Sequence, residues 1–206
     1  MATTLTAQPW ALTPEAVADA ARQGLDEEQV EVAIGVIAMF NYFTRVADAS
    51  GIEFDYQTPL PAFERNLGQA TAPRPSPAAS SQPAAGRRPQ PGYQRLQTAW
   101  ETWRAYVLES DEPLSRRERR LLASVAAEEV ADWEAADALR PDSAGENDNQ
   151  LIAFSRKLSR EPWRMEPGDL DTLRACGYPE QAVLHVISVV AHQNADSRLV
   201  AGLRLT

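Results

Sequence analysis

Two pairs of polar side chains recur at the same spacing in distant parts of the sequence. Asn41 and Arg45 are four residues apart, and so are Asn194 and Arg198. Four residues is just over one turn of a helix, so each pair would share a helix face. Such a pair can hold an anion in a cleft, or it can brace two packed segments from inside. We expect the bracing role, because buried polar groups have to be hydrogen-bonded.

Two histidines offer proton-transfer chemistry. His185 and His192 are separated by seven residues, so on a helix their side chains would lie roughly 10 Å apart, too far for one metal ion to bind both. His192 is a candidate general acid or base. The commoner role for such a residue is a core or interface histidine, and this is the role that we expect.

A run of carboxylates offers metal or acid–base chemistry. Among them, Glu128 and Asp132 are i, i+4 neighbours on a predicted helix. The alternative is a solvated acidic face, which is what a charge run usually forms. The Glu-x-x-His pattern of di-iron helical bundles is missing, so we expect no metal. The run consists of Glu128, Glu129, Asp132, Glu134 and Asp137.

Cys176 is the only cysteine, so an intrachain disulfide is excluded and a reducing compartment is expected. It is a candidate lone nucleophile, but no base adjoins it in the sequence. A half-buried structural cysteine is the expected role. The sequence has no glycine-rich phosphate loop, so no nucleotide cofactor is indicated and we expect no cofactor at all.

The length, net charge and apolar stretches of the chain limit the kinds of partner that it can bind. The chain of 206 residues is long enough to bury a core, and its net charge of −9 argues against a nucleic-acid surface. The N-terminus lacks the basic and apolar regions of a signal peptide. The longest apolar stretch, residues 32–40, is far shorter than a membrane span. We therefore predict a cytoplasmic protein that binds neither nucleic acid nor membrane.

An internal repeat positions these residues. Residues 5–53 align with residues 158–206 at a constant offset of 153, without a gap, and 12 of the 49 pairs are identical. Two copies of one unit are expected to pack about a pseudo-two-fold axis. The histidines are not required by the repeat, because Val32 and Met39 occupy the aligned positions.

Helix signals mark both copies. Thr13 and Pro14 predict a helix start, and Gly24 and Gly177 predict helix ends at aligned positions. Apolar residues at helical spacing then predict a longer helix in each copy. These helices cover residues 26–49 and 179–203.

The region between the copies divides into a linker and further helices. Residues 71–92 hold six of the 15 prolines and predict a mobile linker, preceded by an extended segment that starts at residue 52. Helices are predicted over residues 93–110, over 115–139 from the capping box Ser115-x-x-Glu118, and over 151–158, with a polar loop at 141–150. The predicted fold is all-α. Its parts are an extra half unit (1–70), the linker (71–92) and a complete unit (93–206).

Several of these stretches resemble the alkylhydroperoxidase D and carboxymuconolactone decarboxylase superfamily, in particular its peroxidase-related branch. The resemblance covers residues 93–206 as one unit and residues 5–60 as the second half of another. It implies an all-helical alkylhydroperoxidase D-like fold and assembly as trimers or larger rings. The residues that carry it are Leu114-Ser115, Glu118-Arg119, Leu121, Ala123, Val125, Leu158, Pro162, Asp169-Leu170, Leu173-Arg174, Gly177, Ala191, Asn194, Arg198-Leu199 and the stretch 36–55.

The chain departs from the family at its reactive residues. Peroxidase members use Glu-x11-Cys-x2-Cys-x3-His, in which one thiolate attacks the peroxide and the second cysteine resolves the sulfenate. The aligned positions here are Arg120, Asp132, Ala135 and Leu139, and residues 93–150 contain neither cysteine nor histidine. The dithiol activity therefore does not carry over.

Three hypotheses follow. The first is a degenerate, non-peroxidase member that acts as a scaffold or binds a small molecule or a partner. The second is a thiol-independent acid/base enzyme on a small carboxylate, similar to the decarboxylase branch, using His192, Arg198 and Asp132. The third is a hydroperoxide reductase that uses Cys176 alone or the thiols of a partner.

Overall fold

The computed structural model describes residues 1–52, residue 92 and residues 94–206, and among these the regular elements are all helices. The prediction of an all-α fold is confirmed for this part of the chain. Residues 53–91, with most of the predicted linker and of the predicted extended segment, lie outside the described residues. The elements are α1 (Ala2–Ala7), η1 (Pro9–Ala11), α2 (Pro14–Arg22), α3 (Glu27–Ser50), α4 (Gln94–Glu109), α5 (Arg116–Glu128), α6 (Trp133–Leu139), α7 (Asp148–Arg160), η2 (Pro162–Arg164), α8 (Pro167–Ala175) and α9 (Glu180–Leu203).

The elements of the two aligned segments have matching bounds. The 3-10 turn η1 and the helices α2 and α3 begin and end 153 residues before η2, α8 and α9. Local chemistry accounts for these bounds. The Thr13 side chain accepts a hydrogen bond from the Ala16 amide at 3.3 Å, so it caps α2. Gly24 and Gly177 follow α2 and α8 with φ of 99° and 89°, a left-handed conformation that ends a helix.

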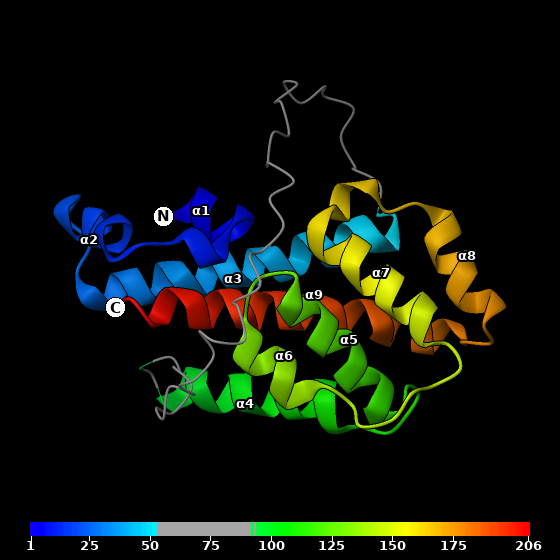
Figure 1. The fold of residues 1–206 in the computed structure, drawn as a ribbon. Helices are drawn as coiled ribbons and strands as arrows, with labels where there is room; N and C mark the ends of the chain where they lie inside the picture. Colours follow the sequence, from blue (N-terminus) through cyan, green and yellow to red (C-terminus); the bar gives the residue numbers. More distant parts are fainter. Residues whose placement is uncertain (53–91, 93) are drawn as a thin grey trace, which may run out of the picture.

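Helices α3 and α9 lie side by side and run in opposite directions through the centre of the molecule (Figure 1). Their contact faces carry the aligned residues Ile34 and Ile187, both of which are buried. The Ile34 side chain packs closely on the backbone of α9 at Gly202, where an added Cβ would lie 2.5 Å from Cγ2 of Ile34. A larger residue at this point would force the Ile34 side chain or the helix pair to shift.

The remaining helices surround this pair on different sides. Helix α5 packs against α6, α7 and α9, and α4 packs against α5 and α9. Helix α4 lies across α9 from α1 and α2 (Figure 1). The larger hydrophobic cluster draws most of its residues from α5, α7 and α9. A second cluster lies between α1, α2, α3 and the C-terminal part of α9, so the N-terminal elements share their core with the last helix.

The single helix predicted over residues 115–139 is wrong, because the chain breaks it in two. Helix α5 ends at Glu128, and α6 starts at Trp133. Ala131 adopts a left-handed conformation with φ of 59°, and the Asp132 carboxylate caps α6 by accepting from the Ala135 amide at 3.3 Å. The next helix, α7, starts at Asp148 and takes up the end of the predicted loop 141–150.

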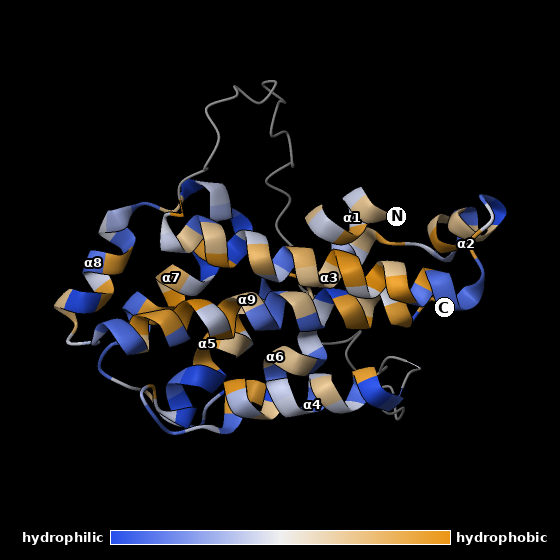
Figure 2. Ribbon diagram, turned by 180° about the vertical axis from the view of Figure 1, so that it is seen from behind, coloured by the Kyte–Doolittle hydropathy of each residue, from blue (hydrophilic) through white to orange (hydrophobic). Residues whose placement is uncertain are grey.

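One side of α3 is exposed to solvent in the described structure. Val32, Val36, Phe40 and Phe43 are 47%, 49%, 65% and 55% exposed, and we call these four residues the outer face of α3. Figure 2 shows apolar residues along most of this helix. Helix α3 is long and apolar enough to cross a membrane by length and composition alone, a test that core helices of soluble proteins also pass. Its other side packs on α9.

Candidate functional site

The first Asn–Arg pair lies on α3, and both side chains are buried. Arg45 donates from Nη1 to the carbonyl and to Oδ1 of Asn41, both at 3.0 Å. It also donates from Nη2 to the carbonyl of Ser159 at 3.0 Å. Because Ser159 belongs to the last turn of α7, Arg45 ties the first aligned segment to the second.

The second pair makes the reciprocal connection. Arg198 donates from Nη1 to the carbonyl and to Oδ1 of Asn194, both at 2.9 Å. Its Nε and Nη2 donate to the carbonyl of Thr6 in α1, at 3.1 and 2.9 Å. Thr6 and Ser159 are themselves aligned positions, so each segment sends an arginine to the same carbonyl of the other.

Both guanidinium groups are charged groups held away from water, and neither makes an ion pair with a carboxylate in the described part of the chain. Burial lowers the pKa of Arg45 to about 10, while Asp48 acts in the opposite direction. Burial also lowers the pKa of Arg198, and the charge of Arg45 lowers it further. Backbone carbonyls and the asparagine amide oxygens accept their hydrogen bonds, an arrangement that suits the predicted bracing role.

His192 faces a different neighbour from Arg198. It is fully buried, and its ring lies edge-on to Trp103 of α4 with centroids 4.5 Å apart and planes at 88°. Trp100, one turn earlier on α4, lies 5.9 Å from the same ring and donates from Nε1 to Asp196 at 2.9 Å. The two tryptophans and the histidine thus join α4 to α9. This surrounding is that of an interface histidine.

The positions aligned with the family's reactive residues are occupied by helix-packing contacts. Arg120 donates from Nη2 to the carbonyl of Ala138 at 2.7 Å. Asp132 caps α6, and Ala135 and Leu139 are buried on that helix. Each polar group at these positions therefore has a role inside the α5–α6 pair.

The three residues of the acid/base hypothesis are directed to three different elements. The hydrogen bond of Asp132 goes to the start of α6, the ring contacts of His192 go to α4, and the hydrogen bonds of Arg198 to another segment go to α1. Helices α1 and α4 lie on opposite sides of α9 (Figure 1). These contacts do not bring the three side chains to one place.

The other carboxylates of the acidic run near α6 lie beside arginines. The Glu129 carboxyl group is buried, and this burial raises its pKa against the lowering effect of Arg160. No group of three or more histidine, cysteine or acidic side chains able to hold a metal occurs among the described residues. Ion pairs account for these carboxylates: Glu128–Arg140, Glu129–Arg156, Glu129–Arg160, Glu134–Arg204 and Asp137–Arg140.

A third buried arginine, Arg119, was not singled out by its chemistry in the sequence because it sits in a run of charged residues, Arg116 to Arg120. It donates from Nε to the Leu114 carbonyl at 2.8 Å and from Nη1 to the Val107 carbonyl at 2.9 Å. Its Nη2 lies 2.9 Å from Nδ1 of His185. Burial and then the Arg119 charge lower the pKa of His185, so the ring accepts this hydrogen bond in its neutral form.

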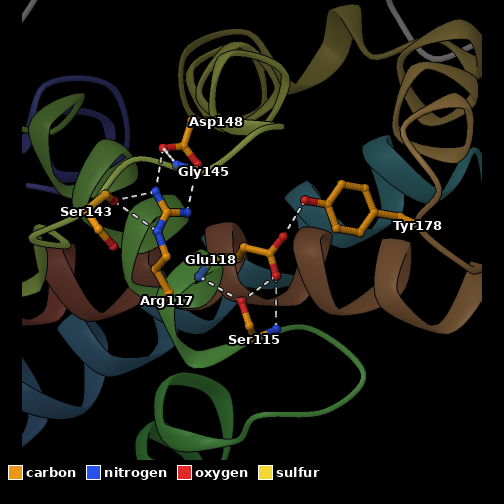
Figure 3. Close-up of polar contacts among 7 residues, drawn as sticks. All are labelled: Ser115, Arg117, Glu118, Ser143, Gly145, Asp148 and Tyr178. Atoms are coloured by element: carbon orange, nitrogen blue, oxygen red, sulfur yellow. Dashed lines mark hydrogen bonds and ion pairs between the residues drawn. The ribbon is translucent and has the colours of Figure 1, made fainter.

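Two side-chain contacts fix the start of α5 against other segments (Figure 3). The Tyr178 hydroxyl donates to the Glu118 carboxylate, which also accepts from the Ser115 hydroxyl in the capping box. Burial and this hydrogen bond raise the pKa of Tyr178. Arg117 donates to Asp148 at 2.8 Å and so holds the loop before α7. Both contacts have a structural role.

Cys176 follows α8 directly and is half-buried. Its carbonyl accepts a hydrogen bond from Nδ2 of Asn147 at 3.3 Å. The aligned position in the first segment is Gln23, which ends α2 in the same way. The residue thus occupies a helix end, as a structural cysteine would.

Comparisons with known proteins add no relative to this picture. No family model matches the chain, no curated protein matches it, and no solved structure matches it.

Proposed function

We propose that this chain is a degenerate member of the alkylhydroperoxidase D and carboxymuconolactone decarboxylase-like superfamily, without peroxidase activity. In this proposal it is built from a duplicated helical unit and acts as a scaffold or as a protein that binds a small molecule or a partner. The protein is cytoplasmic, assembles with copies of itself, and binds neither nucleic acid nor membrane.

One observation carries the proposal. The four positions where the resemblance places the redox residues hold Arg120, Asp132, Ala135 and Leu139, and these side chains cap and pack the α5–α6 pair. A dithiol peroxidase needs two thiols one turn apart with a nearby proton shuttle. The polar side chains at these positions instead make hydrogen bonds within the α5–α6 pair, which supports a protein without this chemistry.

The test is turnover of cumene hydroperoxide with dithiothreitol or lipoamide as the reductant, with the wild type beside Cys176→Ser. We expect no turnover above buffer for either protein. Turnover that vanishes in Cys176→Ser would contradict the proposal and make Cys176 a one-cysteine active site. Turnover that persists in Cys176→Ser would equally contradict it, because a route without thiols would then exist in this chain.

A restored motif provides the matched control. The quadruple variant Arg120→Glu, Asp132→Cys, Ala135→Cys and Leu139→His would place the glutamate on α5, one cysteine at the N-cap of α6, and the second cysteine and the histidine on α6. Turnover gained by this variant, and absent from the wild type, would support a retained scaffold with lost chemistry. Retention of the wild-type circular dichroism spectrum checks that the variant folds.

A further inference from the structure

The outer face of α3 is unusual because its counterpart on α9 is covered. The positions aligned with Val32 and Phe43 are His185 and Asp196. His185 contacts Arg119 of α5, and Asp196 accepts from Trp100 of α4, so α4 and α5 cover this side of α9. On α3 the same side is exposed in the described structure.

Polarity is inverted between the two faces. At three of the four aligned positions the covered face of α9 carries a polar residue, His185, Gln193 or Asp196, where the exposed face of α3 carries valine or phenylalanine; the fourth position is valine in both helices. Solvent exposure alone favours the reverse distribution. An exposed apolar stripe on a helix therefore indicates a surface that another chain covers.

The size of the patch fits a contact between two copies. Two half-exposed valines and two phenylalanines expose roughly 400 Å² of apolar surface, which lies within the range of functional patches on monomers. Two such patches supply roughly 800 Å². Specific interfaces bury roughly 1,200 Å² at the lower end of their range. Homodimer interfaces are about 65% apolar, so roughly 800 Å² corresponds to the apolar part of an interface of that size.

The stripe also has the spacing and charge of a self-complementary helix seam. Val32, Val36, Met39 and Phe43 follow a 4-3-4 spacing, and no charged residue occurs from Val32 to Phe43. Acidic residues gather at the N-terminal end of α3, in a shallow hollow formed with Gly92. A parallel pair would place the two acidic ends together, whereas an antiparallel pair separates them.

Gly35 supplies a second observation. It lies in the middle of α3 at the edge of the outer face, and a Cβ added there would meet nothing within 4 Å. Glycine is unfavourable inside a helix, and it is used where another backbone comes close. The aligned residue on α9 is Ser188, whose hydroxyl lies 3.2 Å from that of Tyr42.

We infer that the outer face of α3 is the interface between two copies of this chain, packed α3 against α3, antiparallel, about a two-fold axis. The inference rests on the self-association proposed above and deepens it, because it names the surface and the symmetry. A two-fold contact makes dimers, whereas the family resemblance implies trimers or larger rings.

Sedimentation velocity of the full chain from about 1 to 100 µM tests this inference. We expect the wild type to sediment as a dimer in this range. Val36→Glu, which puts two carboxylates beside the axis, should sediment as a monomer with at least a tenfold weaker association. Leu184→Glu, at an exposed leucine of α9 away from this face, should leave the dimer intact. Far-ultraviolet circular dichroism spectra that match the wild type would show that both variants fold.

Two further variants test the geometry. In a Cys176→Ser background, Val36→Cys should form an intermolecular disulfide on mild oxidation, whereas Leu184→Cys should not. Gly35→Leu should weaken the dimer, because a close helix contact excludes the larger side chain; stronger association would overturn close packing at this face.

Oligomeric states other than a dimer would overturn the inference, and each would do so in a different way. A trimer that is insensitive to Val36→Glu would overturn it and leave the proposed self-association standing. A monomer at every concentration would overturn both the α3–α3 interface and the proposed self-association. A wild type that is monomeric, with a dimer forming only after deletion of residues 53–91, would show that this segment of the same chain is what covers the outer face of α3. Peroxide turnover bears only on the loss of peroxidase activity, so the two failures are distinguishable.

Discussion

Helices α3 and α9 have the same length, aligned sequences and reciprocal arginine contacts, yet their outward sides differ. On α9 that side is covered by α4 and α5 and carries polar residues with specific partners, such as Asp196 under Trp100. On α3 it is exposed and carries valine and phenylalanine. What covers a helix face, more than its position in the repeated unit, therefore decides its residue types.

The largest expected effect tests whether the two aligned segments form one cooperative core. Ile34 and Ile187 are aligned and buried, so Ile34→Ala and Ile187→Ala should each lower the free energy of unfolding by about 2–5 kcal/mol. Urea unfolding followed by circular dichroism measures both. A much smaller cost for Ile34→Ala, or a second transition, would show that the N-terminal segment is attached loosely.

The next effect concerns the close approach of α3 and α9. Gly202→Ala should destabilise the fold by about 1–3 kcal/mol, because its Cβ would meet Ile34 Cγ2 at 2.5 Å. The double variant Gly202→Ala/Ile34→Ala should lose less free energy of unfolding than the two single variants lose in total. Ala49 occupies the aligned position on α3, so an alanine is compatible with the helix at this point of the repeat. If the losses of the two single variants were fully additive, the destabilisation would not come from the contact between Gly202 and Ile34.

A smaller effect of opposite sign is expected at the α5–α6 junction, which has no counterpart in the first segment. Ala131→Gly should raise the free energy of unfolding by about 1 kcal/mol, because glycine adopts the left-handed conformation without the Cβ clash. Ala131→Val is the matched control and should destabilise. A loss of stability in Ala131→Gly would mean that unfolded-chain entropy outweighs the relief.

The smallest effect is a pH dependence that belongs to α9 alone. The folded pKa of His185 lies below its ordinary value of 6.5, so the unfolded chain binds the proton first as the pH falls. Its contribution to stability is therefore complete above pH 6.5 and is lost as the pH falls through the lower folded value. His185→Val introduces the residue found at the aligned position 32. It should reduce the change of the urea midpoint with pH between pH 5 and 8. An unchanged slope would assign the titration elsewhere.

Much of the fold was predictable because helix ends carry local signals. The capping residues Thr13 and Ser115 and the glycines Gly24 and Gly177 mark helix ends that the structure reproduces. The break at Ala131 was not predictable. Alanine is the strongest helix former, and only the packing of α6 on α5 places it in a left-handed conformation.

The contacts of the candidate site were predictable only in part. The shared helix face of Asn194 and Arg198 follows from their spacing, but the acceptor of Arg198 is the backbone carbonyl of Thr6, and a carbonyl leaves no trace in residue type. The exposure of Phe40 and Phe43 was equally hidden, because their spacing is the same whether or not a helix covers them.

The hydrogen bonds from Arg198 to Thr6 join positions 192 apart in the chain, and they have a consequence for biosynthesis. Helices α1, α2 and α3 are synthesised before α9, yet they bury their apolar sides against it. During translation Leu5 and Ile34 therefore stay uncovered until α9 has been synthesised. Contacts between segments so far apart in sequence are slow to form, so folding should be slow for a helical protein.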